Sequence, residues 1–179
     1  MIRLFIGLPV PDDVRQRLTG LCGGLPGARW VPPENYHMTL RFIGEVEHGQ
    51  AEDIHLALSR ITAPPVQVTL AGLDWFGTRS KVRTVVVKAE RSDPLVHLQR
   101  KVESAVVRVG MDREERKFLP HVALARLRDG RPAEAQHFCD DHAMFKLPPY
   151  AIDRFVLYSS FLSHNGAIYT PEEEYPLVG

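Results

Sequence analysis

The most constraining feature of this sequence is a short pattern that occurs once in each half of the chain. His37-Met38-Thr39-Leu40 in the first half returns in the second half as His121-Val122-Ala123-Leu124. Each copy begins with a histidine and continues as an apolar stretch with a leucine three positions later. Internal similarity of this kind indicates a chain built from two related lobes. A length of 179 residues is enough for one domain of two lobes that share a core.

Both copies have the composition of a β-strand. On an extended strand, His37, Thr39 and Arg41 share one face, and Met38, Leu40 and Phe42 share the other. A polar face is unusual on a strand that is otherwise apolar. If a pseudo-twofold axis relates the two lobes, the two histidines face each other across a central cleft.

The rest of the chain alternates predicted strands with predicted helices. Helices are expected from Pro11 to about Leu21, over 50–61, from Pro94 to Val109 and over 132–141, where apolar residues recur at helical spacing behind a cap or a proline. Strands are expected over 3–8, 37–43, 66–70, 82–87, 119–127, 152–158 and 167–169. This order predicts a single bilobal α+β domain over 1–179, with two antiparallel sheets, flanking helices and one motif per lobe, at 37–40 and 121–124.

Charge and cysteine content limit the classes of protein. Lys+Arg and Asp+Glu both number 22, so the chain has no global basic field of the kind that binds along a duplex. Any nucleic-acid contact is therefore expected to be local, at a cleft. The two cysteines are too few for a disulfide framework and are expected to be reduced. We find no signal peptide and no apolar run of membrane-spanning length, which together predict a cytoplasmic protein.

The paired motifs resemble the His-x-Thr-x motifs of the 2H phosphoesterase superfamily. Their flanks resemble the bacterial LigT-type branch, the RNA 2′,3′-cyclic phosphodiesterases that are also called 2′-5′ RNA ligases. The flanking segments are Arg29-Trp30-Val31-Pro32-Pro33-Glu34-Asn35, Arg41-Phe42-Ile43-Gly44-Glu45 and Phe118-Leu119-Pro120. The resemblance runs from Arg3 to the region of Tyr158. It implies an enzyme that opens 2′,3′-cyclic phosphates at RNA ends without a metal or another cofactor, and that can also join such ends as 2′-5′ linkages.

Two histidines suit this chemistry. Opening a cyclic phosphate needs a base that deprotonates water and an acid that protonates the departing ribose oxygen, and imidazole can serve in either role near neutral pH. The resemblance implies that His37 is the proton donor to the 3′-oxygen and His121 the proton acceptor from water. The product would then be a 2′-phosphate. The residues alone do not order these roles.

One position departs from the family pattern. Thr39 can donate its hydroxyl to a non-bridging phosphate oxygen, but the second motif has Ala123 where the family has threonine. A donor to a charged group contributes about 1.5–3 kcal/mol, so weakened rather than abolished catalysis is expected.

Two arginines and two phenylalanines complete the predicted site. The resemblance places Arg126 on the phosphate, although strict strand alternation puts it on the face opposite His121, so a β-bulge or the strand end would have to redirect it. Arg41 has the same parity as His37 and could line the cleft or be an exposed strand residue. Phe42 and Phe118 could stack on a base, and core packing is the alternative for both.

Two other functions remain open at this point. The first is a related phosphodiesterase acting on a small cyclic phosphate, such as a processed ADP-ribose product. The second is a nucleotide- or RNA-end-binding module with reduced catalysis, which Ala123 makes conceivable.

The expected partners are RNA ends or nucleotides bearing 2′,3′-cyclic phosphate, with tRNA fragments as one source. No membrane or obligate protein partner is expected. The cluster His137-Phe138-Cys139-Asp140-Asp141-His142 lacks the spacing of a helical zinc site.

Overall fold

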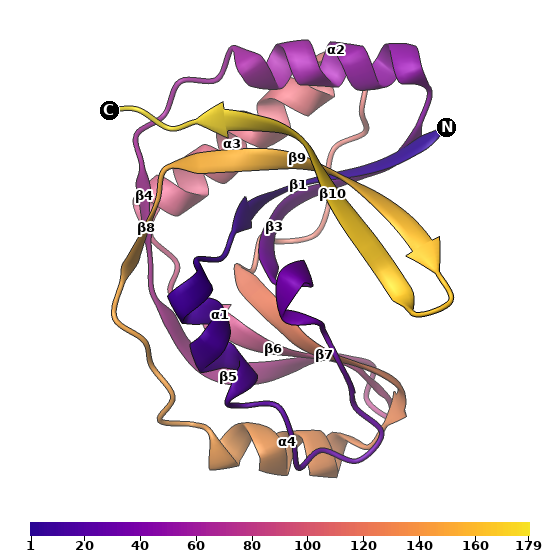
Figure 1. The fold of residues 1–179 in the computed structure, drawn as a ribbon, viewed down its shortest axis with the longest axis vertical. Helices are drawn as coiled ribbons and strands as arrows, with labels where there is room; N and C mark the ends of the chain where they lie inside the picture. Colours follow the sequence, from indigo (N-terminus) through magenta and orange to yellow (C-terminus); the bar gives the residue numbers. More distant parts are fainter.

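The computed structural model describes residues 1–179 and shows that each half of the repeat contributes to its own set of four antiparallel strands (Figure 1). The first set has the order β10-β9-β1-β3 and contains the first motif. The second set is β7-β6-β5, with β2 also paired to β7, and contains the second motif. The strands are β1 (Ile2–Pro9), β2 (Arg29–Trp30), β3 (His37–Val46), β5 (Leu70–Gly77), β6 (Val82–Ala89), β7 (His121–Gly130), β9 (Arg154–Ser163) and β10 (Gly166–Pro176).

The two sets join where β3 meets β7. Met38 pairs with Val122 there, so the two predicted sheets are continuous and form one eight-stranded sheet. In an antiparallel ladder the residues beside a pair also lie opposite each other. His37 is therefore opposite Ala123, and Thr39 is opposite His121. The motifs are related by a local twofold axis at this pair, as the predicted two-lobed α+β fold requires.

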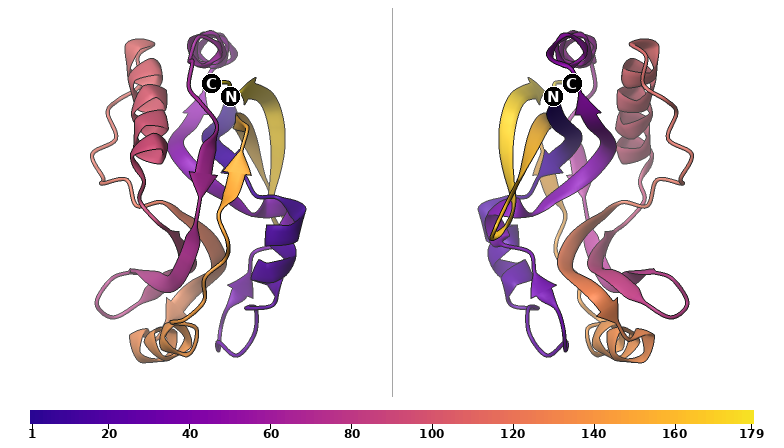
Figure 2. Two further views of the ribbon diagram at one scale, coloured as in Figure 1. Left: turned by 90° about the vertical axis from the view of Figure 1, so that its left-hand side faces the viewer. Right: turned by 90° about the vertical axis from the view of Figure 1, so that its right-hand side faces the viewer.

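Four helices flank the strands: α1 (Asp12–Thr19), α2 (His48–Ser59), α3 (Asp93–Arg108) and α4 (Pro132–Asp141). Figure 2 shows α2 and α3 at one end of the molecule and α4 at the other. Helix α3 begins where the Ser92 side chain accepts a hydrogen bond from the Leu95 N–H, with proline in the first turn. Its apolar stripe is buried in a core shared by both halves: Leu95, Leu98, Val102, Ala105 and Val106.

Two regions differ from the sequence prediction. The single strand expected over 66–70 is divided between β4 (Val66–Val68), which pairs with β8 (Tyr150–Ile152), and β5, whose length was missed. The strand expected over 167–169 is longer, because β10 continues through Glu172-Glu173-Glu174 at the edge of the sheet. An edge strand tolerates charge because one side of it remains in water, and charge there discourages pairing with other chains.

Cys22 and Cys139 are both free thiols, in agreement with the sequence prediction. None of the helices has the length and apolar character needed to span a bilayer.

Candidate active site

The two motif histidines are held in the same way. His37 and His121 are the first residues of β3 and β7. His37 Nδ1 lies 2.8 Å from the carbonyl oxygen of Asn35, and His121 Nδ1 lies 2.6 Å from that of Leu119. Because a carbonyl oxygen can only accept, each Nδ1 carries the hydrogen and donates it. Each Nε2 is therefore available for proton transfer.

A β-bulge follows each histidine and changes which side chains face the cleft. Between β1 and β3, the pairing passes from Gly7 with Thr39 to Ile6 with Arg41, which leaves Leu40 as the extra residue. Between β6 and β7, it passes from Val86 with Ala123 to Val85 with Ala125, which leaves Leu124 extra. An extra residue reverses the alternation beyond it. The residue five positions after each histidine, Phe42 or Arg126, therefore shares the histidine's face.

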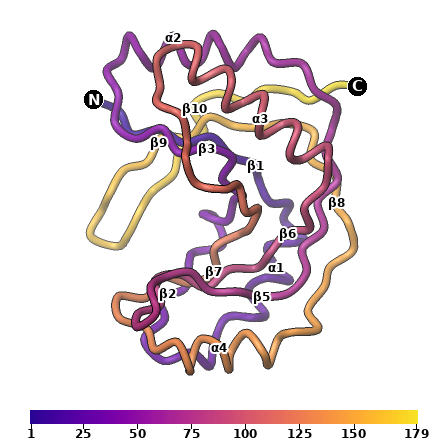
Figure 3. Tube along the Cα trace, turned by 180° about the vertical axis from the view of Figure 1, so that it is seen from behind, coloured from indigo at the N-terminus to yellow at the C-terminus, as the bar shows by residue number.

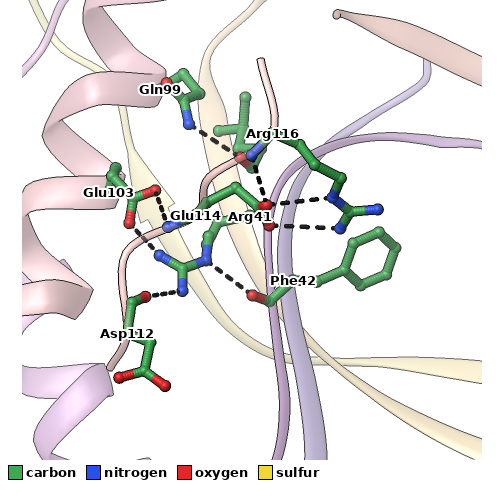
Figure 4. Close-up of polar contacts among 8 residues, drawn as sticks. Arg41, Phe42, Gln99, Glu103, Asp112, Glu114 and Arg116 are labelled. Carbon is green, nitrogen blue, oxygen red and sulfur yellow. Dashed lines mark hydrogen bonds and ion pairs between the residues drawn. The ribbon is translucent and has the colours of Figure 1, made fainter. Parts of the chain in front are cut away.

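The prediction that Arg41 lies on the His37 face is wrong, and the bulge at Leu40 is the reason. Arg41 is only 8% exposed and points toward α3, where its guanidinium contacts the Glu103 carboxylate and the Asp112 carbonyl (Figure 4). Its Nε donates to the Phe42 carbonyl at 2.9 Å. Arg41 fastens α3 and the loop after it to β3, and it does not reach the cleft.

Arg41→Ala is expected to lower the free energy of unfolding by about 3–5 kcal/mol, because Glu103 loses the partner of a largely buried ion pair. The folded fraction should keep its catalytic constants. Denaturant unfolding checks the first statement, and turnover at saturating substrate checks the second. Arg17→Ala, on the exposed side of α1, is the matched control. A stable variant with lost turnover would instead place Arg41 in the site.

Aromatic rings surround each histidine. The centroid of the His37 ring lies 4.7 Å from that of Phe5, 5.9 Å from that of Tyr158 and 5.3 Å from that of Tyr169. The rings of His37 and Tyr169 meet edge-on. His121 has Phe76 edge-on at 5.0 Å. These rings come from β1, β9, β10 and β5. The sequence reasoning missed all four, because no local pattern near either motif indicates which distant strands lie beside it.

The two phenylalanines predicted to contact a base have different positions. Phe42 is 54% exposed, and its ring lies 5.9 Å from that of Phe5, which in turn lies 4.7 Å from the His37 ring. Core packing of Phe42 is thereby excluded. Phe118 is partly buried and packs against the core, while its carbonyl accepts a hydrogen bond from Arg91. Phe118 does not line the cavity described next.

A cavity of about 250 Å³ lies beside the β3–β7 junction. His37, Ala123 and Arg126 line it together with Arg29, which pairs directly across from Arg126. Arg126 also donates to the Thr84 hydroxyl at 3.2 Å. The bulge at Leu124 thus brings Arg126 to the cavity. Arg29 adds a second guanidinium, which the sequence indicated only as part of a flanking segment. The other lining residues are Trp30, Val31, Pro32, Asn35, Asn165, Gly166, Ala167 and Tyr169.

Burial and positive charge lower the pKa of both histidines. The pKa of His37 falls from 6.5 to about 4, chiefly because the ring is buried, while its bond to Asn35 opposes the shift and Arg126 and His121 add to it. The pKa of His121 is also lowered, first by burial and then by Arg126, against its bond to Leu119. Both imidazoles are therefore neutral in the free protein at pH 7. An anion bound beside Arg126 would raise both pKa values.

The hydroxyl beside the first histidine has no counterpart beside the second. Thr39 Oγ1 lies 2.9 Å from His37 Nε2. The same position in the second motif is Ala123, so the Nε2 of His121 lacks this neighbour. No group of three or more His, Cys, Asp or Glu side chains is arranged to hold a metal ion.

Comparison with known proteins gives consistent matches to one family. The model of the family described as LigT like Phosphoesterase matches twice, over residues 8–87 and 85–169. An RNA 2′,3′-cyclic phosphodiesterase of Thermotoga maritima is 31% identical, covering 94% of this chain and 91% of the relative. The Escherichia coli protein of the same name is 30% identical, covering 98% and 97%.

A solved structure shares the whole fold. The crystal structure of E. coli LigT complexed with 3′-AMP superposes with a TM-score of 0.80 at 28% identity, covering 99% of both chains. The family model covers both halves of this chain, with one motif histidine in each match. The chain therefore belongs to the LigT-like phosphoesterase family.

Proposed function

We propose that this protein hydrolyses 2′,3′-cyclic phosphates at RNA ends to 2′-phosphomonoesters. The observation that carries the proposal is the pair of imidazoles on either side of the Met38–Val122 pair, each with Nδ1 bound to a carbonyl and with Nε2 left for proton transfer. The cationic cavity beside them suits a phosphate. Relatives named RNA 2′,3′-cyclic phosphodiesterase, at about a third identity over almost the whole chain, support the same activity.

In the proposed mechanism, His121 Nε2 takes a proton from a water molecule whose oxygen attacks phosphorus. The bond from phosphorus to the ribose 3′-oxygen breaks as His37 Nε2 gives its proton to that oxygen. Arg126 and Arg29 balance the charge on the non-bridging oxygens, and Thr39 donates to one of them. The pKa of each histidine is lowered in the free protein, so the bound phosphate must favour the protonated form of His37 before this residue acts as the donor.

The first test is turnover of 2′,3′-cyclic AMP and of short RNAs with a cyclic phosphate end, in the presence of EDTA. Release of a 2′-phosphate, identified by phosphorus NMR, is the expected result. Preference for an RNA over a mononucleotide or a small cyclic ester would separate RNA ends from the alternative of a small cyclic phosphate. Binding of 2′-AMP without any turnover would favour the RNA-end-binding module. Incubation with 5′-hydroxyl RNA tests 2′-5′ ligation, which reverses the same bond changes.

The proposed surroundings are a reducing compartment, the cytoplasm, and nucleotides or RNA ends as partners. Two free thiols support the first. The second is supported by structures of E. coli LigT complexed with 3′-AMP and with ATP. Fragments of tRNA are one source of such ends.

The pH dependence of kcat/KM follows from the two lowered pKa values. The reaction needs one protonated and one neutral imidazole, so kcat/KM falls as pH rises past the higher pKa of the free pair. Both values lie below the ordinary 6.5. We therefore expect kcat/KM to be highest below pH 6.5 and to decline about tenfold per unit above it. Bound phosphate raises both pKa values, so kcat should decline at higher pH than kcat/KM. A kcat/KM that stays flat up to pH 8 would contradict this assignment.

Restoring the missing hydroxyl should increase activity. In Ala123→Thr, a donor to the charged phosphate contributes about 1.5–3 kcal/mol, so we expect kcat/KM to rise by roughly tenfold or more. Ala123→Val is the control, because valine adds the same volume without a hydroxyl. An equal change in both variants would mean that space, and not hydrogen bonding, governs this position.

A further inference from the structure

Helices α2 and α3 run close together at one end of the molecule (Figures 1 and 3). Residues of both helices line a polar groove there. Its volume is about 430 Å³. The residues that line it are the apolar Ala57, Ile61 and Ala105, the cationic Arg60, Arg100, Lys101 and Arg108, and the polar Thr62, His97 and Ser104. No carboxylate lines it. In a chain of zero net charge, this is a local concentration of one sign.

The arginines of this groove are not used by the fold. Arg60, Arg100 and Arg108 are exposed, and none of the ten ion pairs of the molecule includes any of them. Lys101 is different, because its Nζ donates to the Thr62 carbonyl just after α2. Three guanidiniums therefore stand around one groove with every N–H free for a ligand.

Helix electrostatics account for only part of this arrangement. Arg60 follows α2 directly and Arg108 ends α3, where a cation interacts favourably with the helix dipole. Arg100 lies in the middle of α3 and has no such benefit. Because no carboxylate lines the groove, these cations together create a positive local potential that attracts anions.

The groove is separate from the catalytic cleft. On α3, Gln99 and Glu103 face β3, where they contact the Leu40 carbonyl and Arg41. Residues 97, 101, 104 and 108, at helical spacing on another side of α3, face the groove. The contacts of Arg41 place α3 on the face of β3 opposite His37, so one ligand group cannot occupy the groove and the cleft at once.

We propose that this groove binds the sugar-phosphate backbone of RNA at a distance from the cyclic phosphate end. Arg100 and Arg108 are separated by about 12 Å along the helix, and Arg60 lies across the groove. This spacing suits several phosphates along a strand better than a single phosphate. Guanidinium groups bind phosphate oxygens in bidentate fashion. RNA as the source of these phosphates rests on the proposed function, whereas the anion site itself does not.

The test compares two double variants with wild type: Arg100→Gln with Arg108→Gln in the groove, and Arg17→Gln with Arg131→Gln as an equal loss of charge elsewhere. Binding of a fluorescent 20-nucleotide RNA with a 3′-hydroxyl is measured from 50 to 200 mM KCl. The groove variant should bind at least tenfold more weakly, and its slope of log K against log salt should fall by about 0.7 per lost phosphate contact. Its turnover of 2′,3′-cyclic AMP should equal that of wild type, while its KM for a cyclic-phosphate 20-mer should rise without a change in kcat.

Each other outcome has a definite meaning. Equal RNA binding by wild type and the groove variant, or equal weakening in both double variants, overturns the proposal. Inorganic tripolyphosphate could raise the Tm of wild type but not that of the groove variant, while RNA binding is the same in both. That result would assign the groove to a small anion and overturn the RNA assignment. If wild type turns over no cyclic phosphate yet binds RNA through the groove, the proposed function fails while this inference stands. Thermal unfolding confirms that both double variants are folded.

Discussion

His37→Ala and His121→Ala are each expected to lower kcat/KM for a 2′,3′-cyclic nucleotide by about 10²–10⁴-fold, the contribution of one positioned proton transfer. Each substitution removes the Nε2 that gives or takes a proton, while the bound carbonyl of Asn35 or Leu119 is left to water. The two losses should not multiply in the double variant, because attack and departure at phosphorus belong to one displacement. Steady-state turnover with EDTA present measures all three variants.

His137→Ala, on the exposed face of α4, is the control for general effects of removing a histidine. The choice of leaving group separates the two roles further. Loss of the acid should be partly compensated by a substrate whose leaving group needs no proton, such as a p-nitrophenyl phosphodiester, whereas loss of the base should not. Full activity in either histidine variant would exclude the two-histidine mechanism.

Arg126→Met is the second variant with a large expected effect. Removing one preformed donor to the charge that develops in a transition state costs about 10²–10³-fold in kcat. The loss should also be visible in the pH profile, because Arg126 lowers the pKa of both His37 and His121. Without this cation both pKa values rise, so the decline of kcat/KM on the alkaline side should move to higher pH.

Arg126→Lys distinguishes charge from geometry at this position. Lysine keeps the positive charge, so the pH profile should remain close to that of wild type, while the loss of bidentate hydrogen bonding lowers kcat. A pH profile that is unchanged in Arg126→Met would show that Arg126 does not act on the histidines. An unchanged kcat would show that Arg29 alone serves the phosphate.

Much of the architecture is encoded locally and was predictable. The repeated motif indicated two lobes and a shared cleft, and Pro94 with the apolar stripe behind it indicated α3. The side-chain directions beyond the motif were not predictable from alternation. Leu40 and Leu124 are ordinary apolar strand residues, and nothing in their identity signals a bulge. The bulges decide that Arg126 enters the cavity and that Arg41, with the better parity, leaves it.

The remaining part of the site depends on contacts between segments far apart in the sequence. Phe5 and Tyr158 stack with centroids 4.9 Å apart, and both reach His37 only because β1 lies between β3 and β9. An aromatic residue in an apolar strand usually indicates a core. Which aromatic rings form the wall of a cleft is set by strand order, and strand order follows from the packing of the whole sheet.

The junction at Met38 and Val122 has a consequence for how the two lobes can diverge. A symmetric dimer of identical lobes must carry the same residue at every equivalent position around its axis. Here the lobes belong to one chain, and the positions two and five residues after the histidine differ: Thr39 and Phe42 in one lobe, Ala123 and Arg126 in the other. One lobe supplies a hydroxyl and an aromatic ring, and the other supplies a guanidinium. Covalent fusion thus lets two copies of one motif specialise, and in the proposed mechanism one copy serves the leaving group and the other serves the attacking water.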